Sequence, residues 1–428
     1  MRIGLLGRGI GDTAYLAECG AEILVVDDAS QEVMQPSVDA LKQYKNIRFK
    51  FGPYDLNDFK DRDLILKGAG AALNSPEIEE AYKNNIPVRM SADLFAELSG
   101  ITCVGITGTR GKSTVVHMLH AILKEAGKKV LLGGNVRGVS TLALLPEATP
   151  EHIAVLELDS WQLQGFGEAR ISPHIAIFTT LYPDHLNYYK NHPEQYLADK
   201  ANVFLYQKPS DTLILGKQCA PTIIEKYGER IDSKTLVVDE LKLPDTWTLR
   251  VLGLHNRYNA ALALAAARVL DIPYEVSRHA LTAFAGVPGR LEFIREVDGV
   301  KVYNDTTATT PEATLAALSA LGPENTVIVA GGTDKGLELG GLITGLKSVK
   351  HVVLLAGSGT KRIVGSLQEA GGSKIYGPYD SLAPAVAKAF ELAEPGDNIL
   401  FSPSFTSFGM FKNEFDRGDQ FTVIVQAL

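Results

Sequence analysis

The feature that most constrains this chain is a regular alternation of short apolar runs with longer amphipathic stretches. Apolar runs such as residues 2–7, 101–106 and 351–357 are each followed by residues with helical spacing. Buried strands that alternate with helices form parallel sheets covered on both faces, so we predict an α/β fold. Because 428 residues exceed what one hydrophobic core usually serves, we expect several domains.

Three blocks can be distinguished along the chain. Residues 1–95 begin with a strand, a glycine turn, a helix and a second strand, and we expect a Rossmann-like domain there. Residues 96–288 begin with a glycine-rich loop between an apolar run and a helical pattern, which predicts a P-loop ATPase-type parallel sheet. Residues 289–428 follow a Gly- and Pro-containing turn and predict a second Rossmann-like domain.

Charge and cysteine content exclude several function classes. The net charge is −8 and there is no basic tract, which argues against nucleic acid as a partner. No apolar run approaches the ~20 residues that cross a bilayer, so we expect no membrane insertion. The three cysteines have no metal-type spacing. We therefore expect a cytoplasmic monomer that acts on small molecules.

The first block contains part of a dinucleotide fingerprint. GRGIG (residues 7–11) follows an apolar run, and Asp27 ends the next run. The third glycine of the fingerprint is replaced by Asp12, which could cap a helix but would repel a pyrophosphate. Nucleotide contact and a tight turn without a ligand both stay open, and an NAD-dependent oxidoreductase is a weaker alternative function.

The stretch GITGTRGKST (residues 105–114) predicts a phosphate-binding loop, although Ile106 stands where the P-loop formula has a glycine. The loop lies between an apolar run and a helical pattern, where backbone N–H groups and the helix dipole face an anion. Lys112 adds a positive charge for the β and γ phosphates, and Ser113 or Thr114 offers a hydroxyl to Mg²⁺. A nonenzymatic P-loop switch is an alternative.

Polar residues follow the next apolar runs of the second block. Glu157 ends one run, and Asp184 and His185 follow another. The carboxyl ends of parallel strands meet at one edge of a sheet, so these groups could gather beside the phosphate loop as metal ligands. In the third block, small polar residues follow three apolar runs in the same way, which predicts a second crevice.

The complete set of motifs resembles the Mur ligase family, and its glutamate-adding branch in particular. In chain order the motifs are GITGTRGKST, LELDSWQLQGF, YPDHLNYYKN, DKANVF, GLHNRYN, GRLEF, YNDTTAT, GGTDKG and SPSFTSFGMFKNEFDRGDQF. The resemblance implies ATP- and Mg²⁺-dependent amide formation in peptidoglycan synthesis. The carboxylate of UDP-N-acetylmuramoyl-L-alanine would attack ATP, and glutamate, expected as the D enantiomer, would attack the resulting acyl phosphate.

The resemblance also implies roles for individual residues. The implied catalytic residues are Lys112, Glu157, His185, Lys200 and Arg290. The implied ATP-binding residues are Gly108, Thr109, Gly111, Lys112, Ser113, Thr114, Asn256, Asn259, Arg290 and Asp305. The implied metal ligands are Ser113, Glu157, His185 and a carbamylated Lys200. The implied contacts to the UDP substrate are Ile10, Gly11, Asp27, Asp28, Asn135 and Gln162, and those to the acceptor amino acid are Thr309, Lys335, Ser407 and Phe408.

Four positions depart from the family pattern. Arg110 stands where the loop usually carries Asn, and Asp159 stands where the motif has Ser. Thr307 replaces a lysine on the acceptor side, and Glu414 replaces a phenylalanine. Because these last two changes alter a site that holds a dicarboxylate, we predict altered selectivity for D-glutamate. A related Mur or folylpolyglutamate-type ligase with another acceptor is the alternative.

Overall fold

The computed structural model describes residues 1–428 except 7–8, 69, 137, 185–187, 190–191 and 370–373. The chain divides into two compact units. Unit 1 comprises Met1–Asp245 and Tyr258–Leu281, and unit 2 comprises Thr246–Arg257 and Thr282–Leu428. Three sheets with flanking helices make up the described chain, so the predicted α/β class is confirmed. The domain limits at residues 95 and 288 stay predictions.

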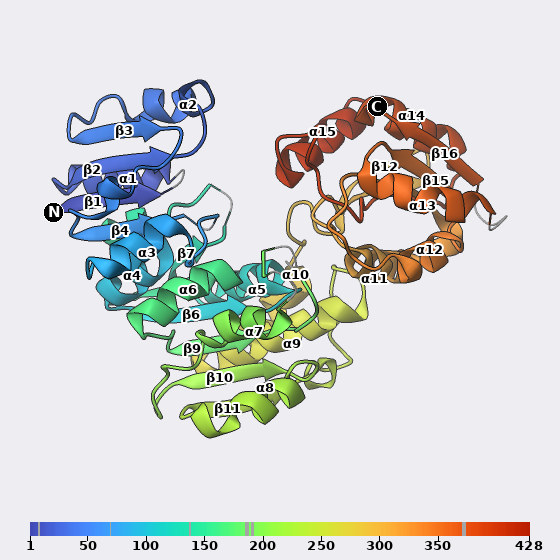
Figure 1. Cartoon of the computed structure of the whole chain (residues 1–428). Helices are drawn as coiled ribbons and strands as arrows, with labels where there is room; N and C mark the ends of the chain where they lie inside the picture. Colours follow the sequence, from blue (N-terminus) through green and yellow to red (C-terminus); the bar gives the residue numbers. More distant parts are fainter. Residues whose placement is uncertain (7–8, 69, 137, 185–187, 190–191, 370–373) are drawn as a thin grey trace. The chain divides into compact units, whose positions relative to one another are not determined.

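The first sheet of unit 1, blue in Figure 1, has the strand order β3-β2-β1-β4-β5, and all its pairs are parallel. Its strands are β1 (Arg2–Leu6), β2 (Glu22–Asp27), β3 (Ile47–Phe51), β4 (Leu64–Lys67) and β5 (Val88–Arg89). Its helical segments are α1 (Ile10–Glu18), α2 (Gln31–Leu41), η1 (Leu56–Phe59), α3 (Pro76–Lys83) and α4 (Ser91–Ser99). Alternate strand residues belong to two separate apolar clusters, so both faces are covered.

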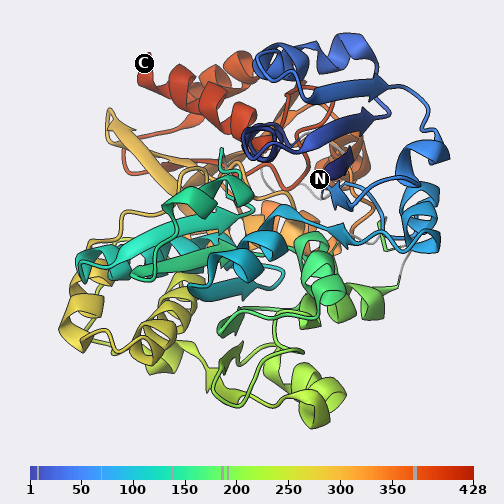
Figure 2. The same ribbon diagram turned by 90° about the vertical axis from the view of Figure 1, so that its left-hand side faces the viewer.

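The second sheet of unit 1 has the order β11-β10-β9-β6-β8-β7 and is also parallel. Its strands range in colour from cyan to yellow-green (Figures 1 and 2). Its strands are β6 (Thr102–Thr107), β7 (Lys129–Gly134), β8 (His152–Glu157), β9 (Ile175–Phe178), β10 (Thr212–Gly216) and β11 (Lys234–Val238). Its helical segments are α5 (Lys112–Glu125), η2 (Leu142–Glu147), α6 (Ser160–Ala169), α7 (Pro193–Ala201), α8 (Ala220–Tyr227), η3 (Gly228–Arg230), η4 (Glu240–Lys242), α9 (Leu254–Val269) and α10 (Tyr274–Ala283). Strand β6 lies between β8 and β9, so groups after those two strands flank the loop after β6.

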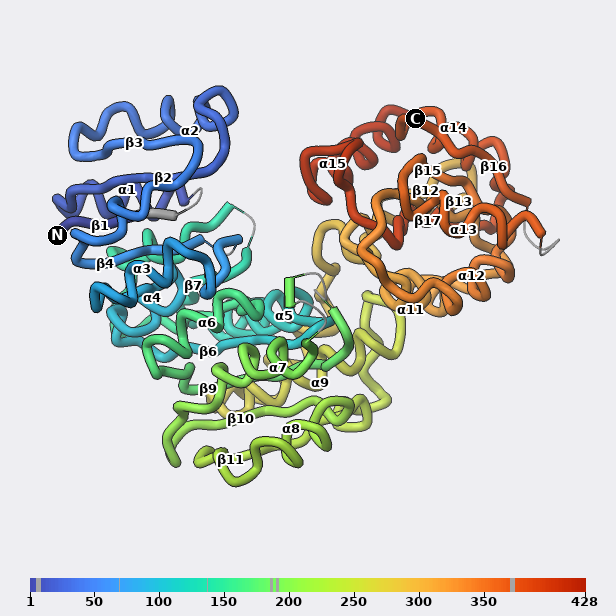
Figure 3. The backbone as a smooth tube through the Cα atoms, in the orientation of Figure 1, coloured from blue at the N-terminus to red at the C-terminus, as the bar shows by residue number. Residues whose placement is uncertain are grey.

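Unit 2 contains one mixed sheet of order β12-β13-β17-β14-β15-β16, in which only the β12–β13 pair is antiparallel among the described residues. Its strands are β12 (Glu292–Val297), β13 (Val300–Asn304), β14 (Thr326–Ala330), β15 (His351–Leu355), β16 (Lys374–Tyr379) and β17 (Asn398–Phe401). Its helical segments are α11 (Pro311–Leu321), η5 (Pro323–Asn325), α12 (Gly340–Leu346), α13 (Ser358–Glu369), α14 (Leu382–Leu392) and α15 (Glu414–Gln426). Figure 3 traces the backbone to its end after α15.

The third sheet brings together the three polar loops of the third block. Strand β17 lies between β13 and β14 and is parallel to both, so all three loops leave at the same edge. Apolar clusters cover both faces of this sheet. In the part of the chain that the structure describes, no helix has the length and apolar character needed to cross a bilayer.

Candidate functional site

The loop after β6 is pressed tightly against the loop after β9. Gly108 has φ +134° and Gly111 has φ +91°, conformations that a side chain rarely adopts. A Cβ on Gly108 would lie 2.1 Å from the hydroxyl of Thr179, and the Thr109 N–H donates to the Thr180 carbonyl at 2.7 Å. The glycines are therefore required by close approach of two backbones as well as by backbone conformation.

Helix α5 begins directly after this loop, at Lys112. Gly111 is the N-cap residue and has no side chain of its own to accept from the first turn. The N–H groups at the amino end of a helix and the helix dipole favour an anion at this position. Ser113 is buried and Thr114 is half-buried in the same first turn. The local geometry is that of a phosphate-binding site.

Two lysines contact this loop from different elements. The Lys112 Nζ donates to the carbonyls of Gly108 and Thr109 at 3.1 and 3.2 Å. The Lys200 Nζ, from α7, donates to the same Gly108 carbonyl at 2.9 Å and to the Thr107 hydroxyl at 3.2 Å. Lys200 is only 1% exposed, so it is not a solvent-facing helix lysine. Burial, and then the charge of Lys112, hold the pKa of Lys200 well below its usual range.

Glu157 is the last residue of β8 and pairs with Ile106 of β6 in register. Its side chain is 4% exposed and makes no hydrogen bond or ion pair with any other described residue. A buried carboxylate without a protein partner is costly, and a metal ion would remove that cost. Asn135 lies beside it, because the Asn135 N–H donates to the Glu157 carbonyl at 2.7 Å.

The oxygen donors at this edge fit Mg²⁺ in type. Glu157 offers a carboxylate and Ser113 a hydroxyl, both hard ligands of the kind that Mg²⁺ prefers. His185 lies outside the described residues. Within the described ranges, no three His, Cys, Asp or Glu side chains gather as a ready metal centre. Lys200 could supply an oxygen only as a carbamate, and the low pKa of its amine favours that modification.

Arg110, a departure from the family pattern, is held between two loops. Its guanidinium lies 3.7 Å from the Asp184 carboxylate, and its N–H donates to the Thr180 hydroxyl at 2.9 Å. Asp184 is 5% exposed and follows β9. Arg110 therefore places a partly exposed positive charge at the phosphate loop, where it is shared with the carboxylate of the neighbouring loop.

The predicted UDP-substrate residues of the first sheet lie at its carboxyl edge. Ile10 and Gly11 begin α1, and Asp27 ends β2 and accepts a hydrogen bond from the Ala29 N–H at 2.9 Å. Asp28 is exposed. A Cβ on Gly11 would lie 2.2 Å from the Ser140 hydroxyl, so α1 approaches the segment that precedes η2.

Asp12 contacts a different element from the one that the sequence indicated. Its buried carboxyl lies near Ser91, Leu142 and Ala143, and burial raises its pKa. The Leu142 N–H donates to the Ser91 hydroxyl at 2.9 Å, so it is Ser91 that joins α4 to η2. The sequence allowed Asp12 to cap its own helix, but the N-cap residue of α1 is Gly9, and the described structure has no side-chain hydrogen bond from Asp12 there.

Gln162 and Asp159 form a reciprocal cap at the start of α6. The Gln162 N–H donates to the Asp159 carboxylate at 2.8 Å, and the Asp159 N–H donates to the Gln162 side-chain oxygen at 3.1 Å. This capping box explains why an aspartate is compatible with this position. It also holds the Gln162 side chain in place, because the amide oxygen accepts from the Asp159 N–H.

The two asparagines of the GLHNRYN motif lie on α9. Asn259 is 5% exposed, and its side-chain oxygen would lie 2.4 Å from a Cβ on Gly111, so it borders the phosphate loop. Asn256 belongs to unit 2, where its side chain donates to the Leu252 carbonyl at 2.8 Å. Only Asn259 is therefore placed with the phosphate loop inside one unit.

Asp305 follows β13 in unit 2 and is held by two hydrogen bonds. One oxygen accepts from the Leu291 N–H at 3.0 Å, and the other accepts from the Ser402 hydroxyl at 2.8 Å. Burial raises its pKa to about 7, although these bonds and the charge of Arg290 oppose the shift. Asp305 therefore also joins the loops after β13 and β17.

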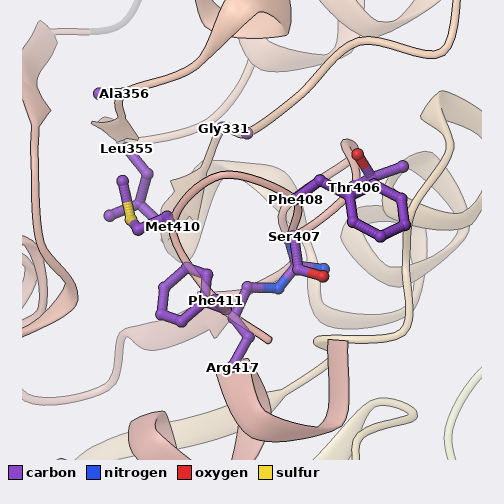
Figure 4. Close-up of a pocket in the computed structure, with 10 residues that line it drawn as sticks. Gly331, Leu355, Ala356, Thr406, Ser407, Phe408, Met410, Phe411 and Arg417 are labelled. Carbon is purple, nitrogen blue, oxygen red and sulfur yellow. The ribbon is translucent and has the colours of Figure 1, made fainter. Parts of the chain in front are cut away.

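The predicted acceptor residues lie at the shared edge of the third sheet. The Lys335 Nζ donates to the Thr309 hydroxyl at 3.3 Å. Ser407 is buried and Phe408 is 66% exposed, and both line one small pocket (Figure 4). The Thr307 hydroxyl donates to the Gly289 carbonyl at 2.9 Å, and Thr307 does not line this pocket.

Arg417, which the sequence reasoning missed, also lines this pocket (Figure 4). It is 1% exposed and donates to the carbonyls of Thr306 and Phe405 at 2.6 and 3.1 Å. Burial lowers its pKa to about 10. The arginine in the FDRGDQF run was the sequence feature that could have indicated this residue. Its burial depends on the packing of α15 against the loops that contain Thr306 and Phe405.

Comparison with known proteins gives two domain matches. Residues 106–267 match the Mur ligase middle domain, and residues 289–405 match the Mur ligase glutamate ligase domain. A UDP-N-acetylmuramoylalanine–D-glutamate ligase of Roseiflexus sp. (strain RS-1) is 34% identical, with 100% of this chain and 97% of the relative covered. The chain belongs to the Mur ligase family. Ligases of the same name from Borreliella burgdorferi and Geobacillus kaustophilus are each 33% identical with the same coverage.

Solved Mur ligases share the fold of this chain. The UDP-N-acetylmuramate–alanine ligase MurC of Thermotoga maritima is 20% identical and has a TM-score of 0.62, with 100% of this chain covered and 99% of that chain. The Thermotoga maritima MurF ligase, solved in complex with ADP, is 16% identical with a TM-score of 0.62 and coverage of 95% and 94%. The predicted family is thus confirmed by sequence and the three-domain Mur ligase fold by structure.

Proposed function

We propose that the chain joins D-glutamate to UDP-N-acetylmuramoyl-L-alanine in peptidoglycan precursor synthesis, with ATP as the energy source, and that it acts in the cytoplasm. The observation that carries this proposal is full-length likeness to Mur ligases that bear this activity in their names. The alternative acceptors are not favoured, because relatives at 33–34% identity over the full chain bear the D-glutamate name, whereas a folylpolyglutamate synthase neighbour is 15% identical and shares the fold alone.

The reaction has two steps. The alanine carboxylate attacks the γ-phosphorus of ATP, which forms an acyl phosphate and releases ADP. The glutamate nitrogen then attacks the acyl carbon, loses a proton, and expels inorganic phosphate. Both reactants of the first step are anions, so the protein must hold them together and neutralise their charge. Lys112 and the amino end of α5 supply positive charge in unit 1, and Arg110 lies in the same loop.

The second step requires an acceptor held with its amine free. Lys335 and Thr309 are joined by a hydrogen bond at the edge of the third sheet, and Ser407 lies in the pocket near Arg417. The ammonium of Lys335 suits a carboxylate of glutamate, and hydroxyl groups suit its remaining oxygens. A glutamate bound through its carboxylates would leave its amine available as the nucleophile.

Mg²⁺ would be held by Ser113, Glu157, His185 and a carbamylated Lys200, and would supply charge neutralisation at the phosphates. Support comes from the buried Glu157 carboxylate, which has no partner among the described residues, and from the lowered pKa of Lys200. A neutral lysine amine can add to CO₂ and lose a proton to form a carbamate, which gives this position an oxygen ligand.

The proposal is tested with purified protein, ATP, Mg²⁺ and UDP-N-acetylmuramoyl-L-alanine. We expect phosphate release that depends on D-glutamate, together with a product of the mass expected for one added glutamate. Absence of both signals with either glutamate enantiomer would overturn the proposal. Parallel reactions with other amino acids and with folate substrates test the alternative acceptors.

A further inference from the structure

Lys67 is a buried lysine that belongs to none of the predicted ATP, metal, UDP-substrate or acceptor sites. It is the last residue of β4 and is 3% exposed. Its Nζ donates to the Ala71 carbonyl at 2.9 Å, which is its one hydrogen bond within the described chain, and it forms no ion pair there. An ammonium has three donors, so two N–H groups are left for another acceptor. Burying a cation that makes a single hydrogen bond and no ion pair is costly, and such positions are candidates for a functional role.

Lys67 lies at the carboxyl end of β4, the edge at which ligands bind to open α/β sheets. In the strand order β3-β2-β1-β4-β5, β2 and β3 lie on one side of β1, and β4 and β5 lie on the other. The point between the parallel strands β1 and β4 is therefore the topological switch point of the sheet. Lys67 pairs in register with Leu6, the last residue of β1, so it lies at the carboxyl edge of this switch point. Ligands of open α/β sheets bind in the crevice outside such a point. Ile10 and Asp27, predicted contacts to the UDP substrate, follow β1 and end β2 at the same edge.

The charge near α1 indicates why a lysine is needed at this edge. In dinucleotide folds the pyrophosphate binds at the amino end of the first helix. Here Asp12 occupies the first turn of α1, and its buried carboxyl oxygen Oδ1 has no hydrogen-bond partner among the described residues. A buried acidic group there disfavours a diphosphate unless a cation lies nearby. Lys67 is the buried cation at the adjacent strand end.

Four acidic residues keep Lys67 charged without pairing with it. Burial lowers its pKa to about 8, and the charges of Asp159, Asp199, Asp93 and Glu168 oppose that shift. These carboxylates belong to α4, to the start and the last turns of α6, and to α7. At pH 7 the ammonium is therefore mostly protonated. Asp159 caps the helix that carries Gln162, so the predicted muramoyl contact lies on an element whose charge acts on Lys67.

We propose that Lys67 binds the diphosphate of the UDP-sugar substrate through its ammonium group. This inference rests on the proposed function for the identity of the sugar nucleotide. Lys67 acts in binding and has no part in the chemical step. The two donors not used by Ala71 would meet phosphate oxygens, and the added negative charge would raise the pKa of the lysine.

The test compares K67M, K67R and the control K83M, which alters a lysine of α3 whose side chain is 68% exposed. Calorimetry without ATP or glutamate gives dissociation constants for UDP-N-acetylmuramoyl-L-alanine and for UDP. ADP binding serves as an internal control for the second sheet. We expect K67M to weaken binding of both uridine diphosphates about tenfold to a hundredfold, the range for a hydrogen-bonded charge. ADP binding, K83M and the kcat of K67M at saturation should stay within about twofold.

A pH series separates binding from a structural role. Wild-type affinity for UDP should fall above about pH 8, by up to about tenfold per pH unit, as the lysine loses its proton. K67R should keep most of the affinity and lose this pH dependence, because arginine stays charged. If K67M bound UDP as tightly as the wild type, or weakened UDP and ADP equally, the proposal would be overturned.

The two proposals can fail separately. A wild-type protein that turns over UDP-N-acetylmuramoyl-L-alanine, with an unchanged KM in K67M, would overturn the role of Lys67 alone. A wild-type protein that binds UDP through Lys67 but releases no phosphate with either glutamate enantiomer would overturn the proposed function and leave the diphosphate site standing.

Discussion

Lys112 and Lys200 donate to the same carbonyl oxygen, that of Gly108, at 3.1 and 2.9 Å. One lysine comes from the first turn of α5 and the other from the last turn of α7. Two ammonium groups around one oxygen repel each other, so one of them is favoured in its neutral form. Lys200 is the more deeply buried of the two, and its pKa is the one held well below the usual range. Burial and this repulsion therefore both favour the neutral amine form of Lys200.

Lys112→Met is expected to lower kcat/KM by about a hundredfold to a thousandfold, because the lost charge stabilises the transferring phosphoryl group. Phosphate release at saturating substrates measures the effect. Lys128 is exposed just after the end of α5, and Lys128→Met is the matched control. Its kcat/KM should equal that of the wild type. ATP turnover unchanged by Lys112→Met would contradict the assignment of this loop.

Lys200 is expected to carry a carbamate under assay conditions. Removal of CO₂ and bicarbonate should lower activity, and bicarbonate should restore it. A ¹³C carbamate signal should appear after incubation with labelled bicarbonate and be absent in Lys200→Arg, because an arginine side chain has no amine to modify. Activity indifferent to bicarbonate, together with a missing signal, would refute this prediction.

Glu157→Gln is expected to raise the Mg²⁺ concentration needed for half-maximal activity by about tenfold or more, because it removes an anionic ligand and keeps the shape. A Mg²⁺ titration of phosphate release measures this. Glu147, exposed at the end of η2, gives the control Glu147→Gln. Equal Mg²⁺ dependence in both variants would show that Glu157 does not bind the metal.

Asp305 is expected to make unit 2 less stable as the pH rises. Its pKa is raised from 3.8 to about 7 in the folded state, so the folded state binds the proton more tightly than the unfolded state. The resulting penalty is absent below about pH 4, grows from there to pH 7, and is complete above it. Asp305→Asn keeps an acceptor for Leu291 and has no titration. Its melting temperature relative to wild type should rise between pH 5 and pH 8, and a constant difference would contradict the cause.

The wild-type protein, with Thr307, is expected to discriminate less between D- and L-glutamate than a variant with lysine at this position. Thr307 has no charge, and its hydroxyl is engaged with Gly289. Initial rates with D- and L-glutamate, side by side, measure the selectivity. Thr307→Lys should lower the KM for D-glutamate, because it adds a cation on the acceptor side. Strict use of the D enantiomer by the wild type would dispose of this prediction.

Local patterns were sufficient where neighbouring residues decide the structure. The strand β6, the loop after it and the helix α5 follow from a short apolar run, glycines at positive φ and helical spacing. The α/β class follows from repetition of such units. Family motifs then supplied the residues of the phosphate loop, and the sheet order placed Glu157 and Asp184 after the two strands that flank it.

The sequence by itself thus determined the class of fold, the glycine loop between β6 and α5, and the family, because each depends on contiguous residues. Only the tertiary structure decided what the isolated charged residues do. Asp12 is buried without capping its own helix, Asp159 caps α6, and Lys67 is buried without an ion pair among the described residues. The charge state and partner of such a group depend on burial and on atoms distant along the chain, which spacing along the sequence does not encode.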